Sequence, residues 1–203
     1  MQGVPRMELL EAMTHPFCPL CRVLRIADER QVWSYLYEHS MDPESRRRFD
    51  ASLGFCRHHA ALAAMVVQER ELVAGATIAL FYESVIGAEP LSPTAVCPIC
   101  EVGQARVRGE ALAFARLLES HWEAYEASAG LCLPHLRELG QGQRLQDDQQ
   151  RRMKRLRKNL RELHRKQAHD VKEAPTKEEQ ESWREALWRF TGVHWDGPLV
   201  KRR

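Results

Sequence analysis

The sequence predicts an all-α protein: two tandem helical modules, then a basic amphipathic helix and a Trp-rich C-terminal helix. Three observations predict this class. Apolar residues recur at helical spacing, no segment alternates apolar and polar residues convincingly as a half-buried strand would, and one cysteine pattern occurs twice. With 203 residues, the chain is long enough for two small domains and an appendage. The expected division is residues 1–89, 90–143 and 144–203.

The composition is that of an ordinary globular protein, with 44% apolar and 29% charged residues, which excludes wholesale disorder. The longest stretches without a charge, 72–82 and 90–100, are 11 residues each, whereas a bilayer span needs about 20. Glu8 and Glu11 stand where a secretory leader would be apolar. We therefore expect no transmembrane segment and a cytoplasmic location, where the six cysteines stay reduced.

The repeat contains every cysteine of the chain. Residues 18–21 read CPLC and residues 97–100 read CPIC, while GFCRHH at 54–59 recurs as GLCLPH at 130–135. Each half is thus CPxC, a spacer of 34 or 31 residues, and G-x-C-x-x-H. Such a repeat is hard to reconcile with scattered buried thiols, and it predicts two sites of one kind.

The spacing is typical of metal ligands. A CxxC turn brings two thiolates together, and Cys-x-x-His places its two side chains on one face of a first helical turn. Three cysteines and one histidine form a closed structural zinc set, so we expect two zinc ions per chain in zinc-stapled modules. Ligands within one repeat need no distant assembly, which favours one set of Cys18, Cys21, Cys56 and His59 and another of Cys97, Cys100, Cys132 and His135. Pairing across the halves, with both CPxC pairs on one ion, stays open.

Two other chemistries compete with zinc. CPxC resembles the motif of thiol–disulfide exchange proteins, so a thiol-based redox or metal-responsive protein is the main alternative. Those proteins place the motif in a βαβ setting that this sequence lacks. An iron–sulfur cluster could also use three cysteines and a histidine, although the ferredoxin spacings are absent.

The expected helices follow in order along the chain. The first spans about 22–39, and Pro43 opens a second at a first-turn position. Apolar runs predict helices over 60–67 and 69–87, and a single long helix is expected over 102–127. Another begins near Cys132 and ends by Gly140. Thr176 and Glu179 have the form of a capping box, which predicts a last helix to about residue 190.

The net charge of +2 is the sum of an acidic N-terminal part and a basic C-terminal part. Residues 1–143 carry 13 basic and 18 acidic side chains, a net of −5, whereas residues 144–203 carry 17 and 10, a net of +7. A stripe of Met153, Leu156, Leu160 and Leu163 predicts an amphipathic helix. Its cations would contact nucleic acid, anionic lipid or an acidic protein, unless the helix simply docks on the acidic body with its cations in solvent. The candidate anion-binding residues are Arg151, Arg152, Lys154, Arg155, Arg157, Lys158, Arg161 and Arg165.

Three tryptophans lie close together near the C-terminus: Trp183, Trp188 and Trp195. We expect them to hold this segment on the body of the protein. An exposed aromatic patch that binds a partner is the alternative.

The duplicated CPxC and G[FL]CxxH motifs resemble those of an uncharacterised bacterial family, known only as a domain of unknown function. The resemblance covers about residues 15–140 and a helical, Trp-containing C-terminus, and it implies a bacterial cytosolic protein without naming a reaction. No phosphate loop, G-x-S-x-G or H-E-x-x-H motif occurs. We therefore expect a binding or adaptor module rather than an enzyme; the oligomeric state stays open.

Overall fold

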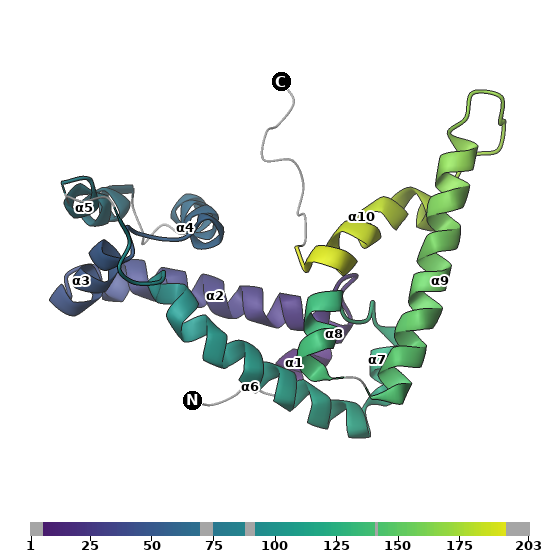
Figure 1. Cartoon of the computed structure of the whole chain (residues 1–203), viewed down its shortest axis with the longest axis horizontal. Helices are drawn as coiled ribbons and strands as arrows, with labels where there is room; N and C mark the ends of the chain where they lie inside the picture. Colours follow the sequence, from purple (N-terminus) through teal and green to yellow (C-terminus); the bar gives the residue numbers. More distant parts are fainter. Residues whose placement is uncertain (1–5, 70–74, 88–91, 141, 194–203) are drawn as a thin grey trace. The chain divides into compact units, whose positions relative to one another are not determined.

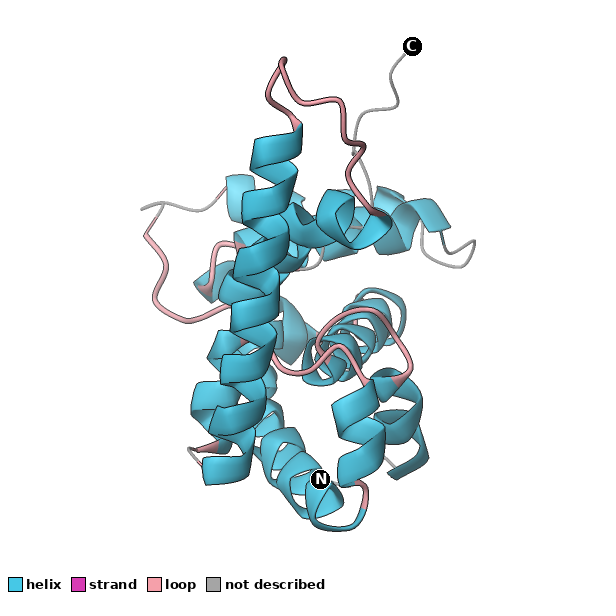
Figure 2. Ribbon diagram, turned by 90° about the vertical axis from the view of Figure 1, so that its right-hand side faces the viewer, coloured by secondary structure: helices cyan, strands magenta, loops and turns pink. Residues whose placement is uncertain are grey.

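The computed structural model describes residues 6–69, 75–87, 92–140 and 142–193. Within these ranges the chain forms ten helices and no strand, which confirms the all-α class (Figure 1), and Figure 2 shows the helices with their connecting loops. In chain order they are α1 Arg6–Met13, α2 Pro19–Glu38, α3 Pro43–Ala51, α4 Arg57–Glu69, α5 Gly75–Ile86, α6 Pro98–Ser120, α7 Trp122–Ala127, α8 Leu133–Leu139, α9 Gln143–Lys166 and α10 Lys177–Thr191.

Two helix starts follow directly from capping residues. Asp42 precedes α3 and accepts hydrogen bonds from the backbone N–H groups of Glu44 and Ser45. Thr176 precedes α10 and accepts from the Glu179 N–H, while the Glu179 carboxylate accepts from the Thr176 N–H. The predicted capping box is therefore confirmed. Free N–H groups at a helix start need such acceptors, which is why these sequence signals are reliable.

One predicted helix is divided in two. The expected helix over 102–127 is wrong in its middle, because α6 ends at Ser120 and α7 begins at Trp122. His121 between them has φ −133° and ψ 37°, which is not helical. The break lets Trp122 and Tyr125 pack against the core of this region. Neither glycine nor proline marks the break, so local sequence signals could not predict it.

The chain divides into two compact units. Unit 1 comprises residues 1–23 and 109–203, and unit 2 comprises residues 24–108. Unit 2 is thus an insertion in the sequence of unit 1, and the divisions fall inside α2 and α6. These limits differ from the expected modules 1–89, 90–143 and 144–203.

The core of unit 1 gathers residues from α1, the start of α2, α6, α7 and α10. In this unit α10 packs on α8 and α9, and α1 packs on α7. Trp188 of α10 is buried in the core, whereas Trp183 remains 46% exposed. The expectation that the tryptophans hold the C-terminal segment is met by Trp188 alone, and Trp195 lies outside the described residues.

The core of unit 2 is built around aromatic rings. Phe49 of α3 is fully buried; its ring lies tilted against that of Phe81 of α5, with the centroids 4.7 Å apart, and edge-on to Phe55 at 4.9 Å. Tyr35 of α2 joins the same group at 5.5 Å from Phe81. Each unit therefore has its own hydrophobic core, and each core includes cysteines of the repeat.

Two candidate metal centres

The first cluster lies in unit 1 and consists of Cys18, Cys21, Cys132 and His135. Cys18 directly precedes α2 and Cys21 lies in its first turn, while Cys132 occupies the position just before α8 and His135 lies in the first turn of that helix. The His135 Nδ1 atom lies 3.5 Å from Cys18 Sγ, 3.3 Å from Cys21 Sγ and 3.2 Å from Cys132 Sγ. The Sγ atoms of Cys21 and Cys132 are 3.6 Å apart. Four donor atoms therefore converge on one small volume.

The second cluster lies in unit 2 and consists of Cys56, His59, Cys97 and Cys100. Its geometry repeats that of the first. The His59 Nδ1 atom lies 3.3 Å from Cys56 Sγ, 3.5 Å from Cys97 Sγ and 3.4 Å from Cys100 Sγ. The Sγ atoms of Cys56 and Cys100 are 3.6 Å apart. All eight candidate ligands are thus brought into two sets of four.

The donor spacing fits a single tetrahedral ion. With metal–sulfur and metal–nitrogen distances of about 2.3 and 2.05 Å, tetrahedral geometry places two sulfurs about 3.8 Å apart and a sulfur and a nitrogen about 3.6 Å apart. In each cluster one sulfur pair, Cys21–Cys132 or Cys56–Cys100, is 3.6 Å apart, and the nitrogen–sulfur distances are 3.2–3.5 Å. All four donors of each cluster lie within 4.8 Å of one another. All six cysteines are free thiols. Each cluster could therefore hold one metal ion.

The ligand pairing corrects the expectation from the sequence. Each cluster combines the CPxC pair of one repeat with the CxxH pair of the other, so the pairing within one repeat is wrong. Joining both CPxC pairs on one ion is also wrong. The reason is helix length. α2 continues 17 residues beyond Cys21 and α6 continues 20 residues beyond Cys100, about 25 and 30 Å of helix. Each helix carries the chain away from its own CPxC pair.

The thiols in each cluster have opposed pKa shifts. Burial disfavours ionisation of Cys97, yet hydrogen bonds from His59 and the backbone lower its pKa to about 6. Burial and the Cys56 sulfur raise the pKa of Cys100 to about 12. In the first cluster the pKa of Cys18 is lowered and that of Cys21 is raised, the latter chiefly by the Cys132 and Cys18 sulfurs. Three thiolates crowded together repel one another, and a bound dication would remove this penalty.

A glycine in the left-handed region opens each CxxH motif. Gly54 has φ 91° and Gly130 has φ 79°. A Cβ atom on Gly54 would lie 2.8 Å from the Tyr82 hydroxyl, and one on Gly130 would lie 2.7 Å from Arg152 Nε. Both glycines are therefore required by backbone conformation and by the close approach of a large side chain.

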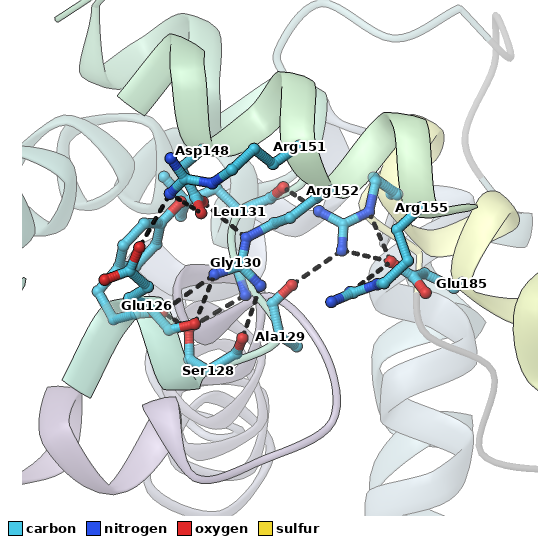
Figure 3. Close-up of polar contacts among 12 residues, drawn as sticks. Glu126, Ser128, Ala129, Gly130, Leu131, Asp148, Arg151, Arg152, Arg155 and Glu185 are labelled. Carbon is cyan, nitrogen blue, oxygen red and sulfur yellow. Dashed lines mark hydrogen bonds and ion pairs between the residues drawn. The ribbon is translucent and has the colours of Figure 1, made fainter. Parts of the chain in front are cut away.

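Arg152 is not an anion-binding residue, which corrects one expectation for α9. Its side chain is 6% exposed and donates to Asp148 Oδ2 at 2.6 Å. It also donates to the backbone carbonyls of Ser128, Tyr125 and Glu126 at 2.7, 3.3 and 3.0 Å. Figure 3 shows Arg152 reaching from α9 onto the loop that leads to Gly130. Arg152 thus holds the loop that leads to Cys132 and His135, two of the four residues of the first cluster.

A sequence signal for this role exists. Asp148, Arg152 and Leu156 are four residues apart and lie on one side of α9, where Leu156 is buried. Arg189 of α10 has a similar role, because it is fully buried and donates to the carbonyls of Leu131 and Ala129 at 3.2 and 2.8 Å. Arg189 is not among the candidates that the sequence suggested; its only local signal is Glu185, four residues earlier, to which it donates.

The remaining candidate cations of α9 are exposed and fall into two groups. Arg151 pairs with Glu126, Arg155 lies 3.8 Å from Glu185, and Arg165 pairs with Glu162 and Glu173 (Figure 3 shows the first two). The other four have no carboxylate within 4 Å in the described part of the chain. We call them the outer basic stripe: Lys154, Arg157, Lys158 and Arg161.

A carboxylate lies beside the histidine of the second cluster. Asp28 Oδ2 is 3.5 Å from His59 Nε2 and 4.0 Å from His58 Nε2, and Asp28 Oδ1 is 3.4 Å from Arg106 Nη1. Burial would lower the pKa of His59, but Asp28 and Cys97 raise it to about 10. No sequence pattern could indicate this contact, because Asp28 follows the CPxC pair that belongs to the other cluster.

Taken together, fold and site define an all-helical protein with two Cys3His clusters that could bind metal. Comparison of the chain with protein families, curated proteins and solved structures finds no match. Among the described helices, none is both long and apolar enough to cross a membrane. The proposed function therefore rests on the clusters and on α9.

Proposed function

We propose that this chain is a zinc-binding helical protein in which each cluster holds one structural zinc ion. One observation carries the proposal: in both clusters three sulfurs and one nitrogen lie within 4.8 Å of one another, and the nitrogen–sulfur distances of 3.2–3.5 Å and one sulfur pair at 3.6 Å are close to those of ligands on one tetrahedral ion. Four protein donors fill a tetrahedral site, which leaves no position for water or substrate. Zinc would then stabilise the fold of each unit rather than perform chemistry.

The donor distances also favour zinc over an iron–sulfur cluster. The ligands of such a cluster are distributed over several irons, so some lie farther apart than the ligands of one ion. Here all four donors lie within 4.8 Å of one another in each set. A redox role needs only the two thiols of a CPxC pair, which form a disulfide on oxidation. Here each pair lies beside a third cysteine and a histidine, which a redox pair does not need and a metal ion does. Reduced thiols fit the proposed cytoplasmic location and the bacterial family resemblance.

Elemental analysis of the purified protein tests the metal assignment. We expect two zinc ions per chain, released by a strong chelator together with a loss of helical signal. If the protein contains iron and absorbs visible light, the clusters bind an iron–sulfur centre and the zinc assignment is wrong. Absence of metal with a reversible Cys18–Cys21 or Cys97–Cys100 disulfide would establish the redox alternative instead.

We further propose that the outer basic stripe contacts the phosphates of a nucleic acid. Its four cations are spaced 3, 1 and 3 residues apart, so they share one face of α9 and span about 10 Å. The opposite face is used for packing, since Leu156 is buried, and so it is not free to enter a membrane. No exposed apolar residue lies within the stripe, which suits phosphate contact better than a protein interface with an apolar centre.

Fluorescence anisotropy with labelled duplex DNA and duplex RNA at several salt concentrations tests this contact. Glutamine at all four stripe positions is expected to abolish most binding and to flatten the salt dependence, by about 0.9 in log–log slope for each lost phosphate contact to DNA. Arg151→Gln with Arg165→Gln is the matched control, because both residues already have carboxylate partners. No binding at low salt, or equal binding by the fourfold variant, would contradict the proposal; binding only to an acidic protein would reassign the partner.

A further inference from the structure

The ring of His59 has one nitrogen that the second cluster does not use. Its Nδ1 atom faces the three sulfurs at 3.3–3.5 Å, so Nε2 points away from them. His59 is 5% exposed, and its Nε2 atom is buried without a hydrogen bond of good geometry. When Nδ1 binds a metal ion, Nε2 carries the proton and needs an acceptor, because a buried N–H without one is costly.

Asp28 is placed to be that acceptor. Its Oδ2 atom lies 3.5 Å from His59 Nε2, slightly beyond a good hydrogen bond. Its other oxygen is held by Arg106, which also donates to Gln31 Oε1 at 2.6 Å. Asp28 and Gln31 both lie on α2, and Arg106 lies on α6. The carboxylate is therefore fixed by a second helix while it faces the histidine of the cluster.

The first cluster has no equivalent. In the ranges that the structure describes, the side-chain partners of the His135 ring are the three cysteine sulfurs of its cluster, without a carboxylate such as Asp28. The position that corresponds to Asp28 in the second repeat, 79 residues later, is Val107. The motif that supplies the candidate metal ligands is thus duplicated, whereas among the described residues the carboxylate contact is found at the second cluster and not at the first.

We propose that Asp28 is the positioning residue of the second cluster: it accepts the His59 Nε2–H, fixes the tautomer that offers Nδ1 to the metal, and strengthens binding at this cluster alone. The inference rests on the proposed metal binding. Carboxylate–histidine–metal arrangements of this kind commonly change metal affinity by about 10- to 100-fold.

Cadmium-113 NMR of the full chain loaded with two cadmium ions gives one resonance per cluster and provides the test. Asp28→Ala is expected to shift the second-cluster resonance and to weaken cadmium binding there about 10- to 100-fold in chelator competition. The first-cluster resonance and affinity should not change. Long-range proton–nitrogen correlation should find the His59 proton on Nε2 in the native chain.

Two further variants separate positioning from general stability. Asp42→Ala weakens unit 2 by removing the cap of α3, whose hydrogen bonds go to Glu44 and Ser45 and not to a cluster residue, and it should leave both affinities unchanged. Asp28→Asn retains an acceptor of the same shape and should give a smaller loss than Asp28→Ala. If Asp42→Ala lowers the second-cluster affinity as much as Asp28→Ala does, the role of Asp28 is merely structural.

Other outcomes overturn the inference in distinguishable ways. A native chain that binds no metal refutes the proposed function itself. A native chain with two ions and an unchanged Asp28→Ala variant refutes only the role of Asp28. A third bound ion that is lost in His58→Gln would make Asp28 a ligand, because Asp28, His58 and His59 also lie close enough to hold an ion.

Discussion

The two clusters have the same ligands but different supports. In unit 1 the ligand loop before α8 is held by two buried arginines from α9 and α10, Arg152 and Arg189. In unit 2 the corresponding glycine meets Tyr82, and Asp28 lies beside the histidine. The repeat therefore accounts for the candidate metal donors and for the glycine that opens each CxxH motif. The residues that hold those donors come from outside the repeated motifs and differ between the units.

Removal of one candidate ligand should give the largest loss of stability. It should also show whether each unit depends on its own metal ion. Cys132→Ser should lose one zinc ion and unfold unit 1 first, and Cys56→Ser should do the same for unit 2. Zinc binding contributes on the order of 10 kcal/mol to small zinc-dependent folds, so the loss of stability in the affected unit should be large enough to measure. Zinc content and amide hydrogen exchange in α8 and α4 measure it. Unchanged zinc content in both variants would refute the assignment.

Arg152→Met should give the next largest effect, confined to unit 1. It leaves the buried Asp148 with only the exposed Arg151, at 3.3 Å, as a charged partner, and it removes three hydrogen bonds to backbone carbonyls of residues 125–128. Together these losses should cost about 3–5 kcal/mol of unfolding free energy. Arg151→Met, its exposed neighbour, should cost at most about 1 kcal/mol. Chemical denaturation of both variants provides the comparison. Similar small losses would show that Arg152 does not hold the loop.

Removal of a helix cap should give the smallest loss of stability, and only the loss in unit 2, where the cap is the ionisable Asp42, should depend on pH. Thr176→Ala should cost about 1 kcal/mol in unit 1 at neutral pH. In unit 2, hydrogen bonds from Ser45 hold the pKa of Asp42 below its usual value. Its contribution is therefore complete above the ordinary carboxyl pKa and is lost as pH falls through the lower pKa of the folded state. The cost of Asp42→Ala, measured by denaturation at several pH values, should shrink in acid; a constant cost would contradict this.

Much of the fold could be predicted because its signals are local. Helical periodicity, Pro43 and the Thr176 capping box depend on residues a few positions apart. The eight candidate ligands were found for the same reason. Their pairing could not be predicted, because it depends on where α2 and α6 take the chain.

Arg152 shows a second kind of limit. It stands within a run of cations and has the same composition signal as Arg151 or Arg155, yet it is buried and they are exposed. Only its register with Asp148 and Leu156 distinguishes it. No local spacing could predict the role of Asp28, because it contacts His59, a residue of another helix that lies 31 positions later in the sequence.

The insertion of unit 2 within unit 1 sets an order of assembly during synthesis. The donors of the second cluster span residues 56–100, so the ribosome has delivered all of them before Cys132 is made. Cys18 and Cys21 emerge earliest but must wait for partners more than 110 residues downstream. The nascent chain can thus complete the Cys3His cluster that starts later in the sequence first, while Cys18 and Cys21 stay without their partners until almost two thirds of the protein has been translated.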